Sequence, residues 1–382
     1  MQRRNIPISL PSMGKEEWEA CKAPIESGWI TQGPKVKEFE TLFAKRHKVK
    51  HAIAVGNCTM ALHLALIACG IKEGDEVLVP AFTWVSTANA VKYCNATPVF
   101  IDIDINTFNI NINEIEKKIT SKTVAIIPVH LFGLCADIDK MKEKYPHLKI
   151  IEDGACAAGS ALHGRPAGSL GHVGCFSFHP RKSITTGEGG MLTTNDDEIA
   201  AYLDRLRNHG ASISEEMRHH GAKPYLLSAF EIIGYNYRMT DIQGAIGVVQ
   251  LKKLDKFIDE RQRWADYYAE NLKEIDWLKT PDVPKGYKHG WQSYVTFVDE
   301  DRSPMRRNEM MEYLQQNGIS TRPGTHAVHM LDVYAKMYTI KPHDFPQAYK
   351  ADQYSMSIPM HNKMVKEDFD YIIEHLKILS HK

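Results

Sequence analysis

Short apolar runs alternate with helical stretches between about residue 50 and residue 200, and this alternation limits the possible folds more than any other feature. The predicted strands are His51–Val55, Glu76–Pro80, Thr97–Asp102, Val124–Leu131 and Leu148–Asp153. The helices predicted between them are Thr59–Cys69, Ser86–Tyr93, Asn113–Ile119 and Ile138–Lys144. Strands that are apolar throughout and separated by helices indicate a mainly parallel sheet with helices on both faces. We therefore predict an α/β fold.

The pattern changes between Val173 and Asn195. Two strand-like runs, VGCFSFHP and GGMLTTN, are joined by RKSITTGE with no helix between them, which predicts an antiparallel pair at the edge of the sheet. A helix over Asp196–Arg207 follows. A long helical region then covers Thr240–Ile275, with Thr240 or Asp241 as its N-cap.

The rest of the chain predicts a smaller α+β domain, with a strand at Ser293–Val298 and helices at Arg306–Asn317 and near Glu367–Leu379. A length of 382 residues is typical of two domains. We place their boundary near residue 250, inside the long helix. Residues 1–250 would form the large cofactor-binding domain, whose N-terminal segment contributes to the site and the dimer, and residues 251–382 the small domain.

Composition excludes several classes of protein. The 47 basic and 47 acidic residues balance, which argues against binding to nucleic acid. Seven scattered cysteines without a C-x-x-C pair indicate a reduced, cytoplasmic protein. The longest apolar stretch, around Ala61–Ile71, is too short to span a membrane, and the N-terminus lacks the apolar run of a signal peptide.

Lys182 is the first candidate for chemistry. It lies in the predicted loop SFHPRKSITTGEGGM, followed by Gly187, Gly189 and Gly190. A lysine that forms an imine needs a partly desolvated amine, and glycines let a flat cofactor approach the backbone. Taken alone, Lys182 is more typical of an ordinary surface loop.

Asp153 strengthens this interpretation. It ends the apolar run LKIIED and precedes the small residues GACAAGS. Ligands of open parallel sheets bind beyond the carboxyl ends of the strands. An acidic side chain at that position suits a cation such as the protonated ring nitrogen of pyridoxal phosphate, although alone it could cap a turn.

A phosphate site is predicted at VGNCTMA, where a strand, a turn and a helix start follow one another. Backbone N–H groups and the Thr59 hydroxyl at a helix N-terminus can bind phosphate, or Asn57 or Thr59 may serve simply as an N-cap. Neither a GxGxxG nor a P-loop motif is present. Trp84 follows the EVLVP strand and could stack on a cofactor ring or pack in the core.

Seven segments together resemble the DegT/DnrJ/EryC1/StrS family of pyridoxal-phosphate sugar aminotransferases: GNCTMALHLAL, DEVLVPAFTWVSTANA, PVFIDID, PVHLFG, IEDGACAAGS, SFHPRKSITTGEGGM and GYNYRMTDIQGAIG. The resemblance runs from about Trp29 into the C-terminal domain. It implies the type I aspartate aminotransferase fold, with a large domain built on a seven-stranded sheet and a small α+β domain.

The resemblance also implies roles for individual residues. Lys182 would bind the cofactor aldehyde, and Asp153 would pair with the pyridine nitrogen. Trp84 would stack on the ring, while Thr59, the Cys58 backbone and Ser177 would hold the phosphate. Asn236 matches an asparagine that reaches the phosphate from the neighbouring subunit, which implies a homodimer with shared active sites.

Substrate contacts are predicted in two places. Arg238 may face the substrate or be a surface charge at a helix start. His326 and His329, in GTHAVH, fall where the C-terminal domain of the family closes over the site, and we expect His329 to contact the substrate. A metal site at this pair is not predicted, because no further ligands accompany it. Candidates for binding a substrate diphosphate are Arg181, Arg238, Arg322 and Lys35.

One position departs from the family. Three residues after the aspartate, the family usually has Gln or His, which contacts the ring hydroxyl, whereas this chain has Cys156. A thiol is a poor hydrogen-bond donor. Dehydratase members have His in place of the lysine, so Lys182 favours transamination.

The resemblance implies transfer of an amino group from L-glutamate to a nucleotide-linked keto-sugar for amino-sugar and surface polysaccharide (lipopolysaccharide O-antigen) biosynthesis. The first candidate acceptor is a 4-keto-6-deoxyhexose, followed by a 3-keto sugar or keto-inositol. Lys182 would act as base and acid in turn, with its pKa kept low by desolvation and the cationic cofactor. Two alternatives stay open: another type I enzyme, such as an amino-acid transaminase or lyase using Arg322 for the α-carboxylate, and a non-catalytic cofactor-binding regulator.

Overall fold

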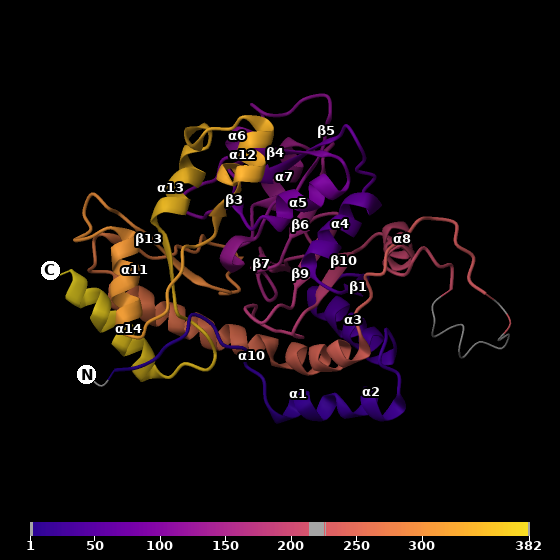
Figure 1. The fold of residues 1–382 in the computed structure, drawn as a ribbon, viewed down its shortest axis with the longest axis horizontal. Coiled ribbons are helices and arrows are strands. Elements are labelled where there is room, and N and C mark those ends of the chain that lie inside the picture. Colours follow the sequence, from indigo (N-terminus) through magenta and orange to yellow (C-terminus); the bar gives the residue numbers. More distant parts are fainter. Residues whose placement is uncertain (1–2, 214–224, 226, 381–382) are drawn as a thin grey trace.

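The computed structural model describes residues 3–213, 225 and 227–380 (Figure 1). Its main sheet has seven strands in the order β1-β10-β9-β6-β5-β2-β4. These strands are β1 (His51–Val55), β2 (Glu76–Pro80), β4 (Thr97–Ile101), β5 (Thr123–Ile126), β6 (Lys149–Asp153), β9 (Val173–Ser177) and β10 (Gly190–Thr194). Only β10 runs antiparallel to its neighbours. The predicted α/β class and mainly parallel sheet are confirmed.

The antiparallel pair forms, but its predicted place at the sheet edge is wrong. β9 and β10 pair as expected, and β1 then pairs with the other side of β10, with Val55 opposite Gly190. β1 is therefore the edge strand. The local pattern around β10 could not show this, because its second partner comes from far earlier in the chain.

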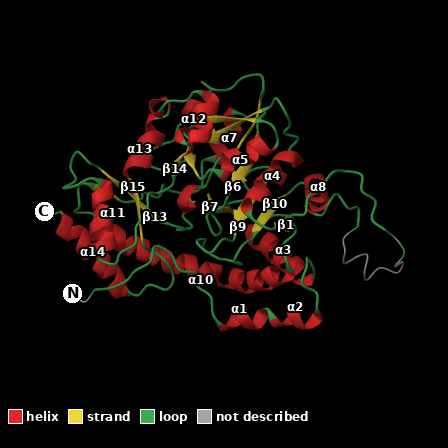
Figure 2. Cartoon of the chain, viewed as in Figure 1, coloured by secondary structure: helices red, strands yellow, loops and turns green. Residues whose placement is uncertain are grey.

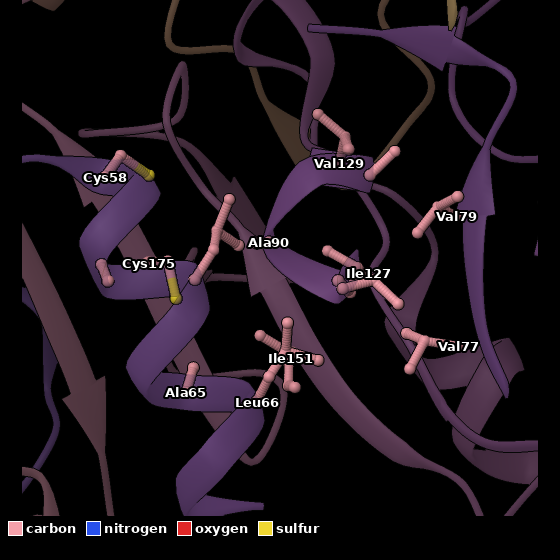
Figure 3. Packing of buried hydrophobic residues seen from close by; sticks show 14 of the residues in the cluster. Cys58, Ala65, Leu66, Val77, Val79, Ala90, Ile127, Val129, Ile151 and Cys175 are labelled. Carbon is pink, nitrogen blue, oxygen red and sulfur yellow. The ribbon is translucent and has the colours of Figure 1, made fainter. Parts of the chain in front are cut away.

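Helices cover both faces of the sheet (Figure 2). On one face, α4 (Cys58–Ala68), α5 (Ser86–Tyr93) and α8 (Asp197–Arg207) pack over β-strand residues such as Val77 and Ile151. Figure 3 shows Cys58, Ala65 and Leu66 of α4 on the left of this cluster, Ile151 of β6 next to Leu66, and Val77 and Val79 of β2 on the right. On the opposite face, Leu78 and Ile150 pack against α3 (Pro34–His47), α7 (Ile138–Lys144) and α10 (Asp241–Leu272).

Several predicted boundaries shift. β5 ends at Ile126 instead of Leu131, and α6 covers only Ile112–Ile115 instead of Asn113–Ile119. The region before His51 had no predicted element, yet it forms α1 (Lys15–Ala20), α2 (Lys22–Ser27) and α3. Thr240 caps α10 as expected, accepting a hydrogen bond from the Gln243 backbone.

A smaller sheet forms the centre of the C-terminal part, in the order β11 (Leu278–Lys279), β13 (Tyr294–Val298), β15 (Ser355–Ile358). Packed with it are α11 (Arg307–Gln316), α14 (Lys366–Leu379) and the end of α10. The N-terminal segment joins this part, because the Ile6 N–H donates to Gly318 O at 2.7 Å. The domain boundary near residue 250 stays a prediction, since α10 runs unbroken through it.

The remaining elements are short. They are β3 (Phe82–Thr83), β7 (Ala161–Leu162), β8 (Arg165–Pro166), β12 (Tyr287–Lys288), β14 (His326–Ala327), α12 (Asp332–Tyr338), α13 (Pro346–Tyr354) and the 3-10 turns η1 (Leu131–Gly133), η2 (Val328–Met330) and η3 (Pro342–Asp344). β14 pairs with β3, which ties a C-terminal segment to the main sheet. In the part of the chain that the structure describes, none of the helices has the length and apolarity needed to cross a membrane.

Candidate active site

The predicted site residues meet at one edge of the main sheet. β1, β2, β6 and β9 all end there, because these four strands run in the same direction. Thr59 follows β1, Trp84 follows the short β3 just beyond the end of β2, Asp153 ends β6 and Ser177 ends β9. The loop between β9 and β10 adds Lys182. This is the edge at which open α/β sheets bind ligands.

Asp153 is buried and held by two hydrogen bonds. Its Oδ2 accepts from Thr87 Oγ1 at 2.8 Å, and its Oδ1 accepts from the Ala155 N–H at 3.2 Å. Burial raises the pKa of Asp153, although the bonds from Thr87 and Ala155 and the charge of Lys182 lower it in part. A cationic ring nitrogen would compensate the buried carboxylate. Sequence reasoning missed Thr87; the hydroxyl-bearing helix start WVSTANA was its only signal.

A second buried carboxylate supports Asp153 from its own strand. Glu152 Oε2 lies 2.8 Å from His130 Nε2 and accepts from the Gly168 N–H at 2.7 Å. His130 Nδ1 accepts from the Ala136 N–H, which assigns the ring hydrogen to Nε2. Burial raises the pKa of Glu152, but the bonds from His130, Gly171 and Gly168 bring it below its usual value. This network fixes the loops on both sides of β6.

Lys182 is partly buried, and its Nζ donates to Cys156 Sγ at 3.2 Å. Burial lowers the pKa of the Lys182 amine, but Cys156, Cys58 and Asp153 together raise it above its usual value. The chain's own groups therefore favour the ammonium form. The low pKa that we predicted would have to come from the charge of the bound cofactor.

The start of α4 fits a phosphate. Asn57 is the N-cap and accepts from the Met60 N–H at 2.9 Å, which leaves the N–H groups of Cys58 and Thr59 at the helix end. A Cβ on Gly190 would lie 2.5 Å from the Asn57 carbonyl carbon, so a glycine is required there. Gly190 pairs with Ser177, which brings that side chain beside the turn.

Trp84 is 59% exposed and faces His326, with ring centroids 5.5 Å apart. The pairing of His326 with Thr83 in β14 and β3 sets this contact. An exposed indole at the carboxyl edge of the sheet is available for stacking on a flat ligand.

His329 differs from our prediction. It has no exposed surface, packs against Phe345 and lies 3.2 Å from Pro342 O through Nε2. Burial lowers the pKa of His329, although hydrogen bonds with the backbone of Pro342 and Ala81 raise it in part. This burial argues against the predicted substrate contact, because the apolar residues of η2 turn His329 inward and leave His326 at the surface.

Arg238 and Asn236 lie beside the phosphate turn. Arg238 bridges to Val55 in an antiparallel sense, and its Nη1 donates to Asn208 Oδ1 at 2.6 Å. Asn236 bridges to Asn208 through the backbone, and its side chain is exposed. The other predicted cations differ in setting: Lys35 bonds Glu38 at 2.7 Å, whereas Arg181 and Arg322 are exposed.

Comparison with known proteins identifies the family. The profile of the DegT/DnrJ/EryC1/StrS aminotransferase family matches residues 11–377. The chain belongs to this family. The prediction of a pyridoxal-phosphate-dependent aminotransferase is thereby confirmed. The site fits the cofactor, since it offers a buried carboxylate, an amine and a phosphate cradle at one sheet edge.

Three relatives of this aminotransferase illustrate the match. The spore coat polysaccharide biosynthesis protein SpsC of Bacillus subtilis is 39% identical over 379 residues, covering 98% of this chain and 97% of the relative. GDP-perosamine synthase of Caulobacter vibrioides is 38% identical over 372 residues, 96% of each. A candidate sugar aminotransferase of Streptococcus pneumoniae, Spr1654, solved in its PLP form, has a TM-score of 0.90 at 29% identity and covers 99% of each chain.

Proposed function

We propose that this aminotransferase moves an amino group from L-glutamate to a nucleotide-linked keto-sugar, a 4-keto-6-deoxyhexose, for the biosynthesis of a surface polysaccharide such as an O-antigen. The observation that carries the proposal is the meeting of Lys182, Asp153 and the start of α4 at one sheet edge. Relatives named GDP-perosamine synthase and spore coat polysaccharide biosynthesis protein support the substrate class.

Bound pyridoxal phosphate supplies an aldehyde and an electron-withdrawing ring. Lys182 would bind the aldehyde and, once displaced, take a proton from the α-carbon of the amino donor and return it to the cofactor carbon. Asp153 would keep the ring nitrogen protonated, with Thr87 holding the carboxylate in place. Thr59, Ser177 and the backbone of Cys58 would hold the phosphate.

The diphosphate of the sugar nucleotide needs cationic partners, and two arginines are suitably placed. Arg181 precedes Lys182, and its carbonyl accepts from Gln292 Nε2 at 2.9 Å. The backbone of Arg322 bridges to Ser357 of β15, and Ser357 pairs on its other side with Val295 of β13. Burial and the charge of Arg181 lower the pKa of Arg322. An anion between the two would relieve this repulsion. His326 and Arg238 would complete the substrate side.

We also infer a cytoplasmic homodimer in which Asn236 reaches the partner's site. All seven cysteines are free, as expected of a reduced compartment. Residues 227–235, between α8 and α10, lie outside the body of the molecule (Figure 1) and carry exposed apolar side chains close to Asn236 in the sequence: Leu227, Phe230 and Ile233. Burying them against a second copy would place Asn236 at that copy's surface.

The test is Lys182→Ala. We expect the variant to bind pyridoxal phosphate without a covalent bond, and its transamination rate to fall by on the order of 10³ or more, because both the covalent link and the proton carrier are lost. Borohydride reduction followed by mass spectrometry locates the cofactor, and a panel of nucleotide keto-sugars with L-glutamate is scored by product mass.

Lys122→Ala is the matched control, since Lys122 is exposed before β5 at the opposite edge of the sheet. Near-normal turnover by Lys182→Ala would refute the role of Lys182. A panel in which only 2-oxo acids accept the amino group would refute the sugar substrate.

A further inference from the structure

The contact between Cys156 and Lys182 stands at the position where this chain departs from its family. Lys182 Nζ donates to Cys156 Sγ at 3.2 Å. Within residues 3–213 and 227–380, the Lys182 amine has no other hydrogen bond or ion pair. The two oxygens of Asp153 accept from Thr87 and Ala155 instead. The sulfur therefore holds the amine, and the carboxylate does not.

The backbones on both sides fix this contact. On the Cys156 side, the Gly154 N–H donates to Cys175 O at 2.8 Å and the Ala157 N–H to Gly154 O at 2.9 Å. On the Lys182 side, the Lys182 N–H donates to His179 O at 2.9 Å. Both turns are thus anchored at the end of β9. The backbone bonds thus fix the two positions from which the side chains of Cys156 and Lys182 reach each other.

We propose that Cys156 is a positioning residue for Lys182: its sulfur accepts a hydrogen bond from the ε-amino group and holds it beside Asp153 at the reaction centre. The proposal rests on the function assigned above to Lys182. A Gln or His at this position would be longer and would present nitrogen or oxygen, whereas a thiol is short, polarisable and can accept from an ammonium group.

The charge on the amine should respond to this partner. Although burial lowers the pKa of Lys182, Cys156 is the largest of the groups that raise it. Removing the sulfur leaves a buried amine with less compensation, so its pKa should fall and more of it should be neutral at a given pH. A Cys156 that only fills space would have no such effect.

The experiment uses the apoprotein, so that it does not depend on turnover. Lys182 is labelled by a limiting amine-reactive acetylating reagent across a range of pH, and its modification is read by peptide mass spectrometry. We expect Cys156→Ala to move the midpoint of labelling to lower pH, with labelling at pH 8 at least about threefold faster, the equivalent of about half a pH unit. Cys94→Ala, at the C-terminal end of α5, is the matched control and should keep the wild-type midpoint.

A chemical variant guards against a folding defect. Treating folded wild-type apoprotein with methyl methanethiosulfonate converts its accessible thiols to methyl disulfides. This treatment should move the midpoint of Lys182 labelling to lower pH in the wild type, and it should leave the midpoint of Cys156→Ser unchanged. In the holoenzyme, Cys156→Ala should lower kcat and change its pH profile with little effect on KM, and Cys156→Ser should restore part of kcat.

An unchanged labelling midpoint in both Cys156→Ala and thiol-modified wild type would overturn the proposal. That result is distinguishable from failure of the proposed function, because labelling of Lys182 in the apoprotein requires neither cofactor nor sugar. A sugar panel without product would refute the substrate class while leaving the labelling result intact.

Discussion

Asp153 is a residue that lowers the stability of the apoprotein and is nevertheless needed for the proposed reaction. Its carboxylate is 4% exposed, and its pKa is raised mainly by burial. A raised pKa in the folded state means that the folded chain binds the proton more tightly than the unfolded chain, whose value is near 3.8. The associated stabilisation is present below that value and is lost as pH rises through the folded pKa. At neutral pH the buried charge therefore destabilises the apoprotein.

We predict that Asp153→Asn leaves the apoprotein at least as stable as the wild type at pH 7, with the difference shrinking toward pH 4. The amide can keep the bond to Thr87 without the buried charge. Turnover should fall by on the order of 10² or more, because nothing holds the ring nitrogen protonated. Thermal unfolding at several pH values and a transamination assay measure the two effects. A clear loss of apoprotein stability in the variant would contradict the sign argued here.

The sequence predicted the main residues of the site but not the contacts that hold them in place. Lys182 and Asp153 could be identified because an imine lysine and an acidic strand end carry distinctive neighbours. Thr87 could not, since its role depends on the approach of α5 to β6. His326 and His329 are three residues apart in one motif, and only the backbone of β14 and η2 decides which of them is buried.

Among the elements, α3 and α10 cross unusually closely, through two glycines of α10. A Cβ on Gly244 would lie 2.6 Å from the Val36 nitrogen, and one on Gly247 would lie 2.6 Å from the Phe39 ring. Asp241, in the first turn of α10, accepts from the Val36 N–H at 2.8 Å and so caps α3, whose own N-cap is Gly33. The crossing thus joins a helix that sequence patterns predicted to one that they missed.

We predict that Gly247→Val destabilises the apoprotein by about 1–3 kcal/mol, the usual effect of overpacking. Valine is a better helix former than glycine, so a loss of stability would have to come from the clash with Phe39. Phe39 packs on Phe178, in the loop that carries Lys182, with ring centroids 5.0 Å apart, so cofactor affinity should fall as well.

Denaturant unfolding measures this change, and Gly14→Ser is the control, because a Cβ there meets nothing within 4 Å and serine is favourable at this N-cap of α1. Equal stability of Gly247→Val and wild type would show that the two helices can separate at little cost.

Local patterns predicted most elements between His51 and Arg207, because apolar strands and amphipathic helices have different periods. These patterns did not predict the end of a segment where contacts with residues distant in the sequence decide it. The predicted strand Val124–Leu131 stops at Ile126, before Pro128, and the following residues turn toward His130 and its bonds to Glu152 and Ala136. The outer place of β1 is likewise a property of the sheet as a whole.

At the scale of the whole molecule, residues 227–235, between α8 and α10, are unusual for a monomer. The Ser212 N–H donates to Ala229 O at 2.9 Å. This bond pairs the stretch of chain that comes from α8 with the stretch that leads to α10, and both lie outside the body of the molecule (Figure 1). Ile233 is 90% exposed, Leu227 80% and Phe230 65%. Large apolar side chains at this exposure, gathered within seven residues of the chain, are typical of a surface that another protein covers.

We predict that Ile233→Asp weakens the proposed homodimer and, with it, cofactor binding. A charge in the middle of a buried apolar contact costs several kcal/mol, enough to shift a micromolar protein toward monomer. Because Asn236 would reach the partner's phosphate site, the apparent Kd for pyridoxal phosphate should rise together with the monomer fraction, and higher protein concentration should restore both. Light scattering after size exclusion and a cofactor titration measure the two quantities.

Val365→Asp is the matched control, since Val365 is 49% exposed at the N-cap of α14, in the C-terminal part of the chain, where an aspartate is also a favourable cap. It should leave mass and cofactor affinity unchanged. If Ile233→Asp stays dimeric, the apolar segment after α8 is not the contact. If it becomes monomeric with full affinity for pyridoxal phosphate, each chain completes its own phosphate site and the shared-site arrangement is wrong. The coupled loss of both properties, with recovery at higher protein concentration, is the outcome expected if the partner supplies Asn236.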